Sequence, residues 1–223
     1  MGISCLLLGI PAVAADIIVD DPIDGYGTPG TLRVALEMAN NGDTIRFAPQ
    51  LAGATITINP SYGELMVRRL ITIDGDINGD TQPDIVLDGG GIARIMTVRP
   101  YSTGQVVING LVFRRGYSPS SGGCLVQQAS SVSITHSAFD QCVAVYDGGA
   151  ILNFNELHVQ HTEFRDNLAS RGAGIVSFSG SPIEITESRF VGNVSNRWGG
   201  GTYFYGGSSV QVSDSYFADN FAL

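Results

Sequence analysis

Apolar and polar residues recur along the second half of the chain with a period of 25–27 residues. Within one period, residues 131–135 alternate polar and aliphatic side chains, which predicts a strand with one buried face. A unit of this length cannot bury its own apolar face, so we expect successive units to stack on one another. One phenylalanine marks each unit: Phe113, Phe139, Phe164, Phe190 and Phe217.

Glycine clusters follow four of these phenylalanines by eight or nine residues, and short strands are expected after the glycines, as in residues 150–154. Residues 105–223 show no helical periodicity. We therefore predict an all-β fold, a right-handed single-stranded parallel β-helix, whose hand follows from the general preference for right-handed crossovers. The glycines are expected where φ is positive or the chain bends sharply: Gly122-Gly123, Gly148-Gly149, Gly172-Ala173-Gly174 and Gly199-Gly200-Gly201.

Equivalent positions in stacked coils should form ladders of like side chains along the axis. The phenylalanines are expected to fill the core. Asparagine recurs three positions after phenylalanine, as Asn167, Asn193 and Asn220. Stacked asparagines can hydrogen-bond to one another, and asparagine tolerates a left-handed backbone, so we expect both at these positions.

The N-terminal part has a different pattern and predicts a cap. Residues 31–40 form an expected helix, with Thr31 as its N-cap, Gly42 at its end and one apolar face made of Leu32, Ala35, Leu36 and Ala39. The end of a solenoid exposes apolar core and unpaired strand edges. We therefore expect residues 16–54 to cap a β-helix of residues 55–223. Short strands are expected at residues 16–19, 43–47, 54–58 and 70–73.

Both ends of the chain suggest processing or assembly. Residues 1–15 combine an apolar run with small residues up to Ala15, which fits a secretion signal, whereas an apolar strand is the alternative. No basic residue precedes Arg33, so the usual basic start of a signal is missing. Residues 220–223 end in mid-coil. We expect a solenoid truncated at this end, or a last coil that stacks end to end on a partner.

The chain is acidic, with 12 Lys+Arg, 21 Asp+Glu and a net charge of −9. An acidic surface repels polyanions, so nucleic acid is not an expected partner, and no apolar run is long enough for a transmembrane helix. Polarity carried by Gly, Ser, Thr and Asn fits a secreted or bacterial cell-surface solenoid. Cys124 and Cys142 take different positions around the coil, so we expect two buried thiols rather than a disulfide.

Two family resemblances follow from these motifs. The repeats resemble the FxxN and GGA(I/L/V) motifs of chlamydial-type polymorphic outer-membrane proteins, which are autotransported β-helix adhesins: residues 148–151, 164–167, 190–193 and 217–220. Residues 31–40 and 42–45 resemble the CSLREA domain of bacterial secreted β-helix proteins, although four residues depart from it: Gly30, Thr31, Val34 and Leu36. The resemblances imply a β-helix at a cell surface and bring no catalytic residues.

Residues 74–80 have the spacing of a calcium-binding loop. Oxygen-bearing side chains stand at its positions 1, 3, 5 and 7, and glycine stands at position 6. Acids this close together repel one another without a cation, although Asp, Asn and Gly also dominate ordinary polar turns. The candidate Ca²⁺ ligands are Asp74, Asp76, Asn78, Asp80 and Asp84.

Two other clusters could bind a ligand. His136 and His161 share one position in adjacent coils, which Glu187 and Asp214 continue. These residues could bind a transition metal or sense pH. We favour the alternative that they are a row of exposed turn residues. Aromatic residues gather in the last two coils and could stack on sugars or a partner, although alternation puts Phe204 toward the core: Trp198, Tyr203, Tyr205 and Tyr216.

Parallel β-helices include polysaccharide lyases and hydrolases, which need paired carboxylates or a Ca²⁺ cluster with a basic residue. The outward positions six residues before phenylalanine hold one acid in five. Asp140 and Asp166 are expected to pair with Arg114 and Arg165. We therefore predict a non-catalytic secreted or surface protein, adhesin-like or structural, that binds glycans or surfaces of host or neighbouring cells. The alternative is an extracellular polysaccharide lyase or glycoside hydrolase of the pectate-lyase-like class.

Overall fold

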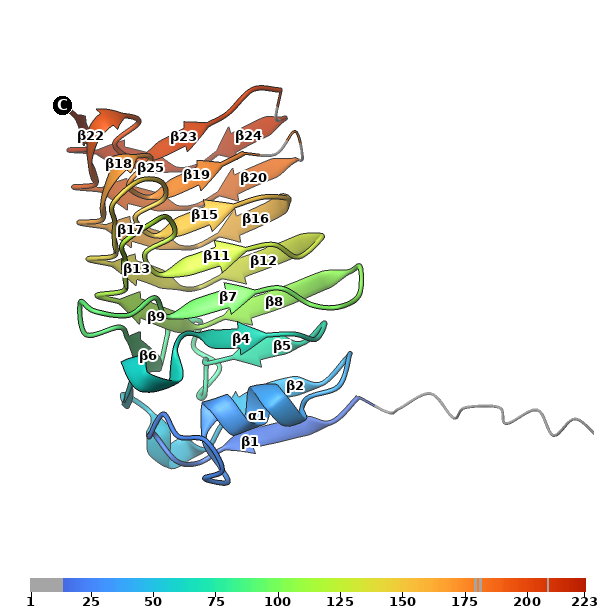
Figure 1. The fold of residues 1–223 in the computed structure, drawn as a ribbon. Helices are drawn as coiled ribbons and strands as arrows, with labels where there is room; N and C mark the ends of the chain where they lie inside the picture. The colour runs from blue at the N-terminus through green and yellow to red at the C-terminus, as the bar shows by residue number, and fades with distance from the viewer. Residues whose placement is uncertain (1–13, 179, 181, 208) are drawn as a thin grey trace, which may run out of the picture.

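Four parallel β-sheets build the molecule, and their strands stack in successive coils (Figure 1). The computed structural model describes residues 14–178, 180, 182–207 and 209–223. The longest sheet contains eight strands, one from each coil, so the described chain makes about eight turns. This arrangement confirms the parallel β-helix that the phenylalanine period predicts.

The eight-stranded sheet receives one strand from every coil. In spatial order its strands are β1 (Asp16–Val19), β2 (Thr44–Phe47), β5 (Thr72–Asp74), β8 (Gln105–Asn109), β12 (Ser131–Thr135), β16 (Glu156–Gln160), β20 (Ile183–Thr186) and β24 (Val210–Ser213). The seven-stranded sheet carries the phenylalanines. Its strands are β3 (Thr55–Thr57), β6 (Ile85–Asp88), β9 (Leu111–Arg114), β13 (Ala138–Asp140), β17 (Glu163–Arg165), β21 (Arg189–Val191) and β25 (Tyr216–Ala218).

Two shorter sheets close each coil before the chain returns to the eight-stranded sheet. The five-stranded sheet contains β10 (Tyr117–Ser118), β14 (Val143–Ala144), β18 (Leu168–Arg171), β22 (Val194–Trp198) and β26 (Phe221–Ala222). The six-stranded sheet contains β4 (Leu65–Val67), β7 (Met96–Val98), β11 (Leu125–Gln127), β15 (Ile151–Asn153), β19 (Ile175–Ser177) and β23 (Thr202–Phe204). Two 3₁₀ helices, η1 (Pro49–Leu51) and η2 (Pro60–Tyr62), lie in the early coils.

The phenylalanines form the predicted core ladder. They pair in register across adjacent strands of the seven-stranded sheet. Neighbouring rings are stacked with centroids 4.4–5.0 Å apart. The first four are fully buried, whereas Phe217 in the last coil is 43% exposed. Each of the last five coils therefore supplies one ring to a continuous apolar column, which Leu87 and Ile56 extend into the earlier coils.

An asparagine ladder runs beside this column. Asn167 Nδ2 donates to Asn193 Oδ1 at 2.8 Å, and Asn193 Nδ2 donates to Asn220 Oδ1 at 2.8 Å. Each amide also donates to a phenylalanine carbonyl oxygen of the preceding coil. The prediction of positive φ at asparagine is wrong, because the left-handed residue precedes it, as at Asp166 and Asp219. That bend comes just before the asparagine, whose amide lies inside the coil.

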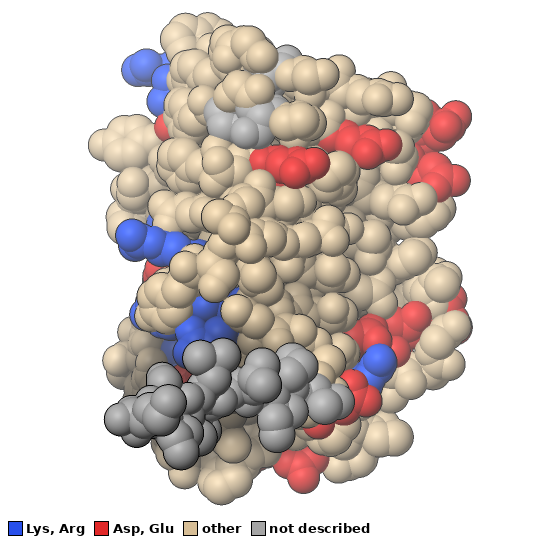
Figure 2. All heavy atoms as spheres, turned by 90° about the vertical axis from the view of Figure 1, so that its right-hand side faces the viewer, with Lys and Arg blue, Asp and Glu red and all other residues tan. Residues whose placement is uncertain are grey.

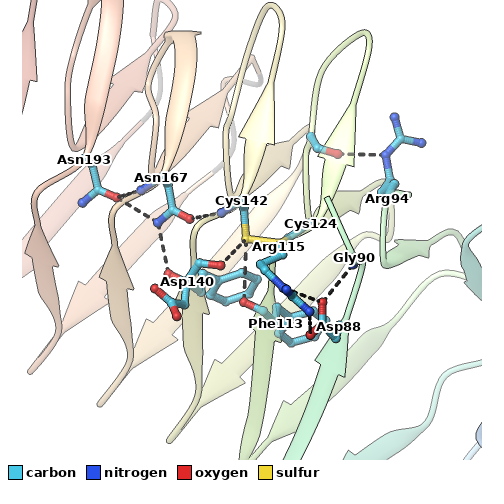
Figure 3. Close-up of a disulfide and its surroundings, with 12 residues drawn as sticks. Asp88, Gly90, Arg94, Phe113, Arg115, Cys124, Asp140, Cys142, Asn167 and Asn193 are labelled. Carbon is cyan, nitrogen blue, oxygen red and sulfur yellow. Dashed lines mark hydrogen bonds and ion pairs between the residues drawn. A yellow bond between two sulfur atoms is a disulfide. The ribbon is translucent and has the colours of Figure 1, made fainter. Parts of the chain in front are cut away.

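Cys124 and Cys142 form a disulfide with Cα atoms 5.5 Å apart, so the prediction of two thiols is wrong (Figure 3). Cys142 takes the ladder position of asparagine in its coil, and its N–H donates to Asn167 Oδ1. Gly116 takes that position in the coil before, where a Cβ would lie 2.5 Å from Cys124 Sγ. The cysteines do differ in coil position, but the missing side chain lets them meet inside the narrow coil.

The predicted helix is α1 (Leu32–Met38), and Thr31 caps it by accepting a hydrogen bond from the Val34 N–H. It is the one α-helix among the residues that the structure describes. Its predicted apolar face is buried: Leu32, Ala35, Leu36 and Ala39. The helix packs on β1 and β4 at the N-terminal end of the solenoid (Figure 1). It covers the edge of the six-stranded sheet, while β1 and β2 continue the eight-stranded sheet.

Two acids hold this N-terminal end together. The Arg33 Nε donates to Asp24 Oδ1 at 2.6 Å, and both side chains are buried. Asp24 also accepts the Asn59 N–H, which links the helix to the second coil. Asp43 accepts the N–H groups of Asn40 and Ala15, and these backbone hydrogen bonds hold the pKa of Asp43 below its usual value.

The glycine clusters satisfy two requirements of the backbone. Gly148 has φ of +63°, and a Cβ there would overlap the Ile151 carbonyl oxygen. A Cβ at Gly149 would overlap the Ala173 carbonyl oxygen of the next coil. The first glycine therefore allows a left-handed turn, as predicted, and the second allows two coils to approach closely.

The N-terminal signal predicted for residues 1–15 lies outside the described residues except for Ala14 and Ala15. In the part of the chain that the structure describes, no helix is long and apolar enough to cross a membrane.

Candidate binding groove and acidic hollow

A shallow groove of about 470 Å³ lies over the outer face of the six-stranded sheet. Its floor includes Val126 and Leu152, which form an apolar cluster separate from the core. Leu125 and Ile151 point into the core, so the next residue of each strand points outward. The groove therefore has an apolar floor because successive residues of these strands are apolar and point to opposite faces of the sheet.

Phe154 and Phe178 line this groove, and aromatic rings of the next coil continue the row beyond it. Phe154 stacks on Phe178 at 6.0 Å between centroids, and Phe178 stacks on Tyr205 at 4.3 Å. Tyr203 meets Tyr205 edge-on at 4.7 Å and stacks on Trp198 at 5.7 Å. Burial raises the pKa of the Tyr205 phenol. Because the rings stack along the axis, they offer mainly their edges to a ligand.

The structure brings together three of the four aromatic residues that the sequence singles out, namely Trp198, Tyr203 and Tyr205. Tyr216 lies apart in β25 of the seven-stranded sheet, with the Arg189 guanidinium 5.1 Å from its ring centroid. Phe204 packs on the core, as alternation predicts. Sequence reasoning missed Phe154 and Phe178, although they precede Tyr205 at the equivalent place in two earlier coils.

Three arginines lie where the groove meets a smaller hollow beside α1, which Arg68 and Arg69 line, while Arg99 lines the groove itself. Arg68 and Arg69 follow β4, and Arg99 follows β7. Guanidinium carbons of Arg68 and Arg69 lie 5.7 and 5.4 Å from the Tyr101 ring centroid, and Arg68 Nη1 donates to Tyr101 Oη at 3.1 Å. We call Arg68, Arg69, Arg99 and Tyr101 the arginine end of the groove. The sequence pattern gave no indication that residues 31 positions apart would meet here.

An acidic hollow of about 540 Å³ lies over the outer face of the eight-stranded sheet. Within it, His158 Nδ1 lies 3.1 Å from Glu184 Oε2, while His158 Nε2 lies 2.9 Å from Glu156 Oε1 at its edge. Glu187 and Asp214 also line it. In Figure 2 most acidic side chains lie in the right half of the view and most basic side chains in the left half. The two outer faces thus differ in charge.

The histidine row beside this hollow matches the reading of exposed turn residues. The rings of His136 and His161 stack with centroids 4.9 Å apart, and His161 Nε2 lies 2.9 Å from Glu187. His136, His161, Glu187 and Asp214 all have φ near +50°. Over the described residues, no group of three or more His, Cys, Asp or Glu side chains is placed to hold a metal ion.

The candidate calcium turn uses its acids as hydrogen-bond acceptors. Asp76 accepts the Gly79 N–H at 2.8 Å and the Thr81 N–H at 3.0 Å. Asp84 accepts the Ile77 N–H at 2.8 Å. Asp80 accepts from Asn78 Nδ2 and the Gln82 N–H, and Asp74 pairs with Arg46 and accepts from Asn109. Calcium at this turn stays a prediction.

Arginine–aspartate pairs line the turn after the phenylalanines, in part as predicted. Asp140 pairs with Arg165 at 3.2 Å, but Arg114 pairs with Asp88 of the preceding coil instead of Asp140. Asp88 is 1% exposed and also accepts from Arg115 and the Gly90 N–H (Figure 3). Burial raises the pKa of Asp88, but the hydrogen bonds from Arg115, Gly90 and Arg114 outweigh it, so the pKa falls below its usual value.

Comparison with known proteins supports the fold. The family model described as right handed beta helix region matches residues 89–221. A curated protein of Dictyostelium discoideum, named metabotropic glutamate receptor-like protein P, is 25% identical over 118 residues. That match covers 53% of this chain and 8% of the Dictyostelium protein, so the chain spans a small part of its relative. No solved structure matches the chain.

Proposed function

Because the chain belongs to the right-handed β-helix family, we propose that it is a non-catalytic protein displayed outside the cell, adhesin-like, which binds glycans or other surface partners through its outer faces. The observation that carries the proposal is the groove over the six-stranded sheet. A regular interior fixes the coils, while the outward positions vary from apolar to basic along this groove. A rigid support with a variable exterior suits recognition at a surface.

The disulfide supports export, because disulfides persist mainly in oxidising compartments. The apolar, small-residue pattern of residues 1–15 supports the same location. The resemblances to chlamydial-type polymorphic outer-membrane proteins and to CSLREA domains favour a bacterial cell surface.

The second candidate function is polysaccharide cleavage, and the acidic hollow is the observation that favours it. Glu156 and Glu184 both contact the same imidazole, that of His158, from opposite nitrogens. A glycoside hydrolase needs two carboxylates about 5–10 Å apart on either side of a sugar. In this hollow the imidazole occupies the space between the two carboxylates. No arginine lines the hollow among the described residues, so nothing there would neutralise an acidic substrate.

The test is incubation of the full chain with pectin, alginate and neutral polysaccharides, followed by assays for reducing and unsaturated ends. We expect no release of ends, because in the described hollow His158 occupies the space between the two carboxylates of Glu156 and Glu184. Glu184→Gln serves as the matched variant, since it keeps the shape of the side chain and removes its charge. Cleavage by the parent that Glu184→Gln abolishes would replace the adhesin proposal with the hydrolase.

A further inference from the structure

We propose that the arginine end of the groove binds an anionic glycan, a chain of sugars bearing carboxylate or sulfate groups. The inference rests on the proposed binding function and names the ligand class of the groove. The observation behind it is that the arginines without an ion pair gather in one place on the surface of this acidic chain.

Among the described residues, ion pairs with acids neutralise two thirds of the positive charges of the protein. Eight of the twelve basic residues form ion pairs with Asp or Glu, and all twelve are arginines. None of the ion pairs among the described residues includes Arg68, Arg69 or Arg99. Three of the four arginines that remain therefore share one place on the surface, and Arg197 is the fourth.

The placement of these arginines costs stability unless an anion joins them. Val67 of β4 pairs with Val98 of β7, and Arg68 and Arg99 directly follow these two residues. The two arginines therefore take neighbouring positions in adjacent coils, where like charges destabilise a sheet. An anion that bridges the two guanidinium groups removes this repulsion. Glu37 lines the same hollow as Arg68 and Arg69, but none of the ion pairs among the described residues joins it to either.

The arginine end continues into the aromatic part of the groove. Arg68, Arg69 and Tyr101 line a hollow of about 240 Å³, and Arg99 lines the groove of about 470 Å³. Met66 lines both, so the two hollows adjoin. From β4 to β19 the six-stranded sheet contains five strands, which at about 4.8 Å per step span about 19 Å. This span fits several linked units better than a single small ion.

The chemistry of the lining indicates an acidic glycan. Arginine binds planar and tetrahedral oxyanions through two parallel hydrogen bonds, as carboxylate and sulfate groups require. Met66, Phe154 and Phe178 offer apolar edges for the C–H faces of sugar rings. The acidic hollow and the net charge of −9 repel a long polyanion such as a nucleic acid elsewhere on the molecule. A glycan chain that follows only this groove avoids that repulsion.

The experiment is titration calorimetry of the full chain with three oligosaccharides of six units. A hexagalacturonate carries carboxylates, a heparin hexasaccharide carries sulfates as well, and cellohexaose is neutral. We expect binding of one or both anionic oligosaccharides and none of cellohexaose. The triple variant Arg68→Ala/Arg69→Ala/Arg99→Ala should bind about tenfold or more weakly, a loss of about 1.4 kcal/mol or more. Arg197→Ala is the matched control and should bind like the parent.

Other outcomes would overturn the inference. These are no binding of either anionic oligosaccharide, equal binding by the triple variant, or equal binding of cellohexaose. Equal affinity for a single-stranded DNA or an acidic peptide of the same charge would show a general polyanion surface and contradict a glycan site. Circular dichroism of the triple variant checks its fold. Release of sugar ends by the parent protein would contradict the proposed function. If the parent neither binds the anionic oligosaccharides nor releases ends, only this site is contradicted.

Discussion

At the scale of the residue, buried polar side chains decide where the coils meet. In the asparagine ladder, Asn167 and Asn193 use both amide hydrogens, because each Nδ2 donates to the next asparagine and to a carbonyl oxygen. Asp88 uses its carboxylate in the same way, with two arginines and a backbone N–H. Side chains of this kind stabilise the fold only while all their partners remain.

The asparagine ladder leads to the first prediction. Asn193→Ala removes the acceptor of the Asn167 amide and of its backbone N–H, both of which are buried. We expect the free energy of unfolding to fall by about 2–3 kcal/mol, measured by urea denaturation. Asn155→Ala is the control, because the side-chain amide of this half-buried asparagine makes one exposed hydrogen bond, to the Gln128 carbonyl oxygen, and its loss should change the free energy of unfolding by less than about 1 kcal/mol. Equal losses in both variants would contradict a special role for the ladder.

Acid should weaken the fold through Asp88 and Asp43. Both have a pKa below the usual value in the folded state, so each adds stability above the unfolded pKa of about 4 and loses it as the pH falls through the lower folded pKa. We expect a constant Tm from pH 7 to about 5 and a fall below about pH 4. Asp88→Asn should lower the Tm at pH 7 and reduce the acid-induced fall. Parallel pH profiles for variant and parent would contradict this assignment.

At the scale of the element, the sequence predicts neighbours along the axis better than neighbours across it. A repeat aligns equivalent positions of successive coils, so the phenylalanine and asparagine ladders follow from spacing alone. Residues at different positions around a coil meet only where the shape of its cross-section brings them together. The repeat spacing carries no information on that shape. The disulfide depends on that cross-section and was missed for this reason. Arg114 and Asp88 are neighbours along the axis, in register on β9 and β6, and this pair was missed because the repeat that aligns the coils begins only near residue 105.

The helix α1 could be predicted because its signals are local, namely Thr31 at its start and the apolar residues spaced along one face. The candidate site was predicted only in part. Trp198, Tyr203 and Tyr205 are close in sequence and lie together, whereas Tyr216 lies two strands after β23, in the seven-stranded sheet. Arg68 and Arg99 meet through the register of β4 and β7, which the irregular early coils conceal.

The disulfide should stabilise the coils that it links. It closes a loop of 18 residues, and loops of about this length contribute about 3 kcal/mol in the chain-entropy model. We expect Cys124→Ser/Cys142→Ser to lower the Tm clearly. The circular dichroism spectrum typical of β-structure should persist at about 20 °C. The parent in reducing agent should approach the variant slowly, because both sulfurs are buried. A variant with an unchanged Tm would show that the bridge adds no stability.

The turn of residues 74–84 gives the prediction for calcium. Asp74, Asp76, Asp80 and Asp84 concentrate negative charge there, and Arg46 is the basic residue that pairs within it, at Asp74. If oxygen ligands gather around Ca²⁺ as the spacing predicts, calcium should raise the Tm of the parent. It should not raise the Tm of Asp76→Ala. Identical responses of parent and variant, or no response of either, would reject this site.

At the scale of the whole molecule, one interior supports two outer faces of opposite character. The eight-stranded sheet presents carboxylates held by histidine, and the six-stranded sheet presents arginines and aromatic edges. Repetition makes the interior uniform, because every coil must fit the next. The exterior carries no such constraint, so recognition can be placed on one face without a change in the fold.

The measurement that tests the central claim most directly is hydroxyl-radical footprinting of the full chain with and without a bound anionic hexasaccharide. Tyr101 is 70% exposed and Tyr216 is 54% exposed, so both should react in the free protein. The account predicts that the glycan protects Tyr101, Met66 and Phe154 in the groove and leaves Tyr216 and His158 unprotected. Protection of His158 in the acidic hollow, with Tyr101 unchanged, would contradict the account.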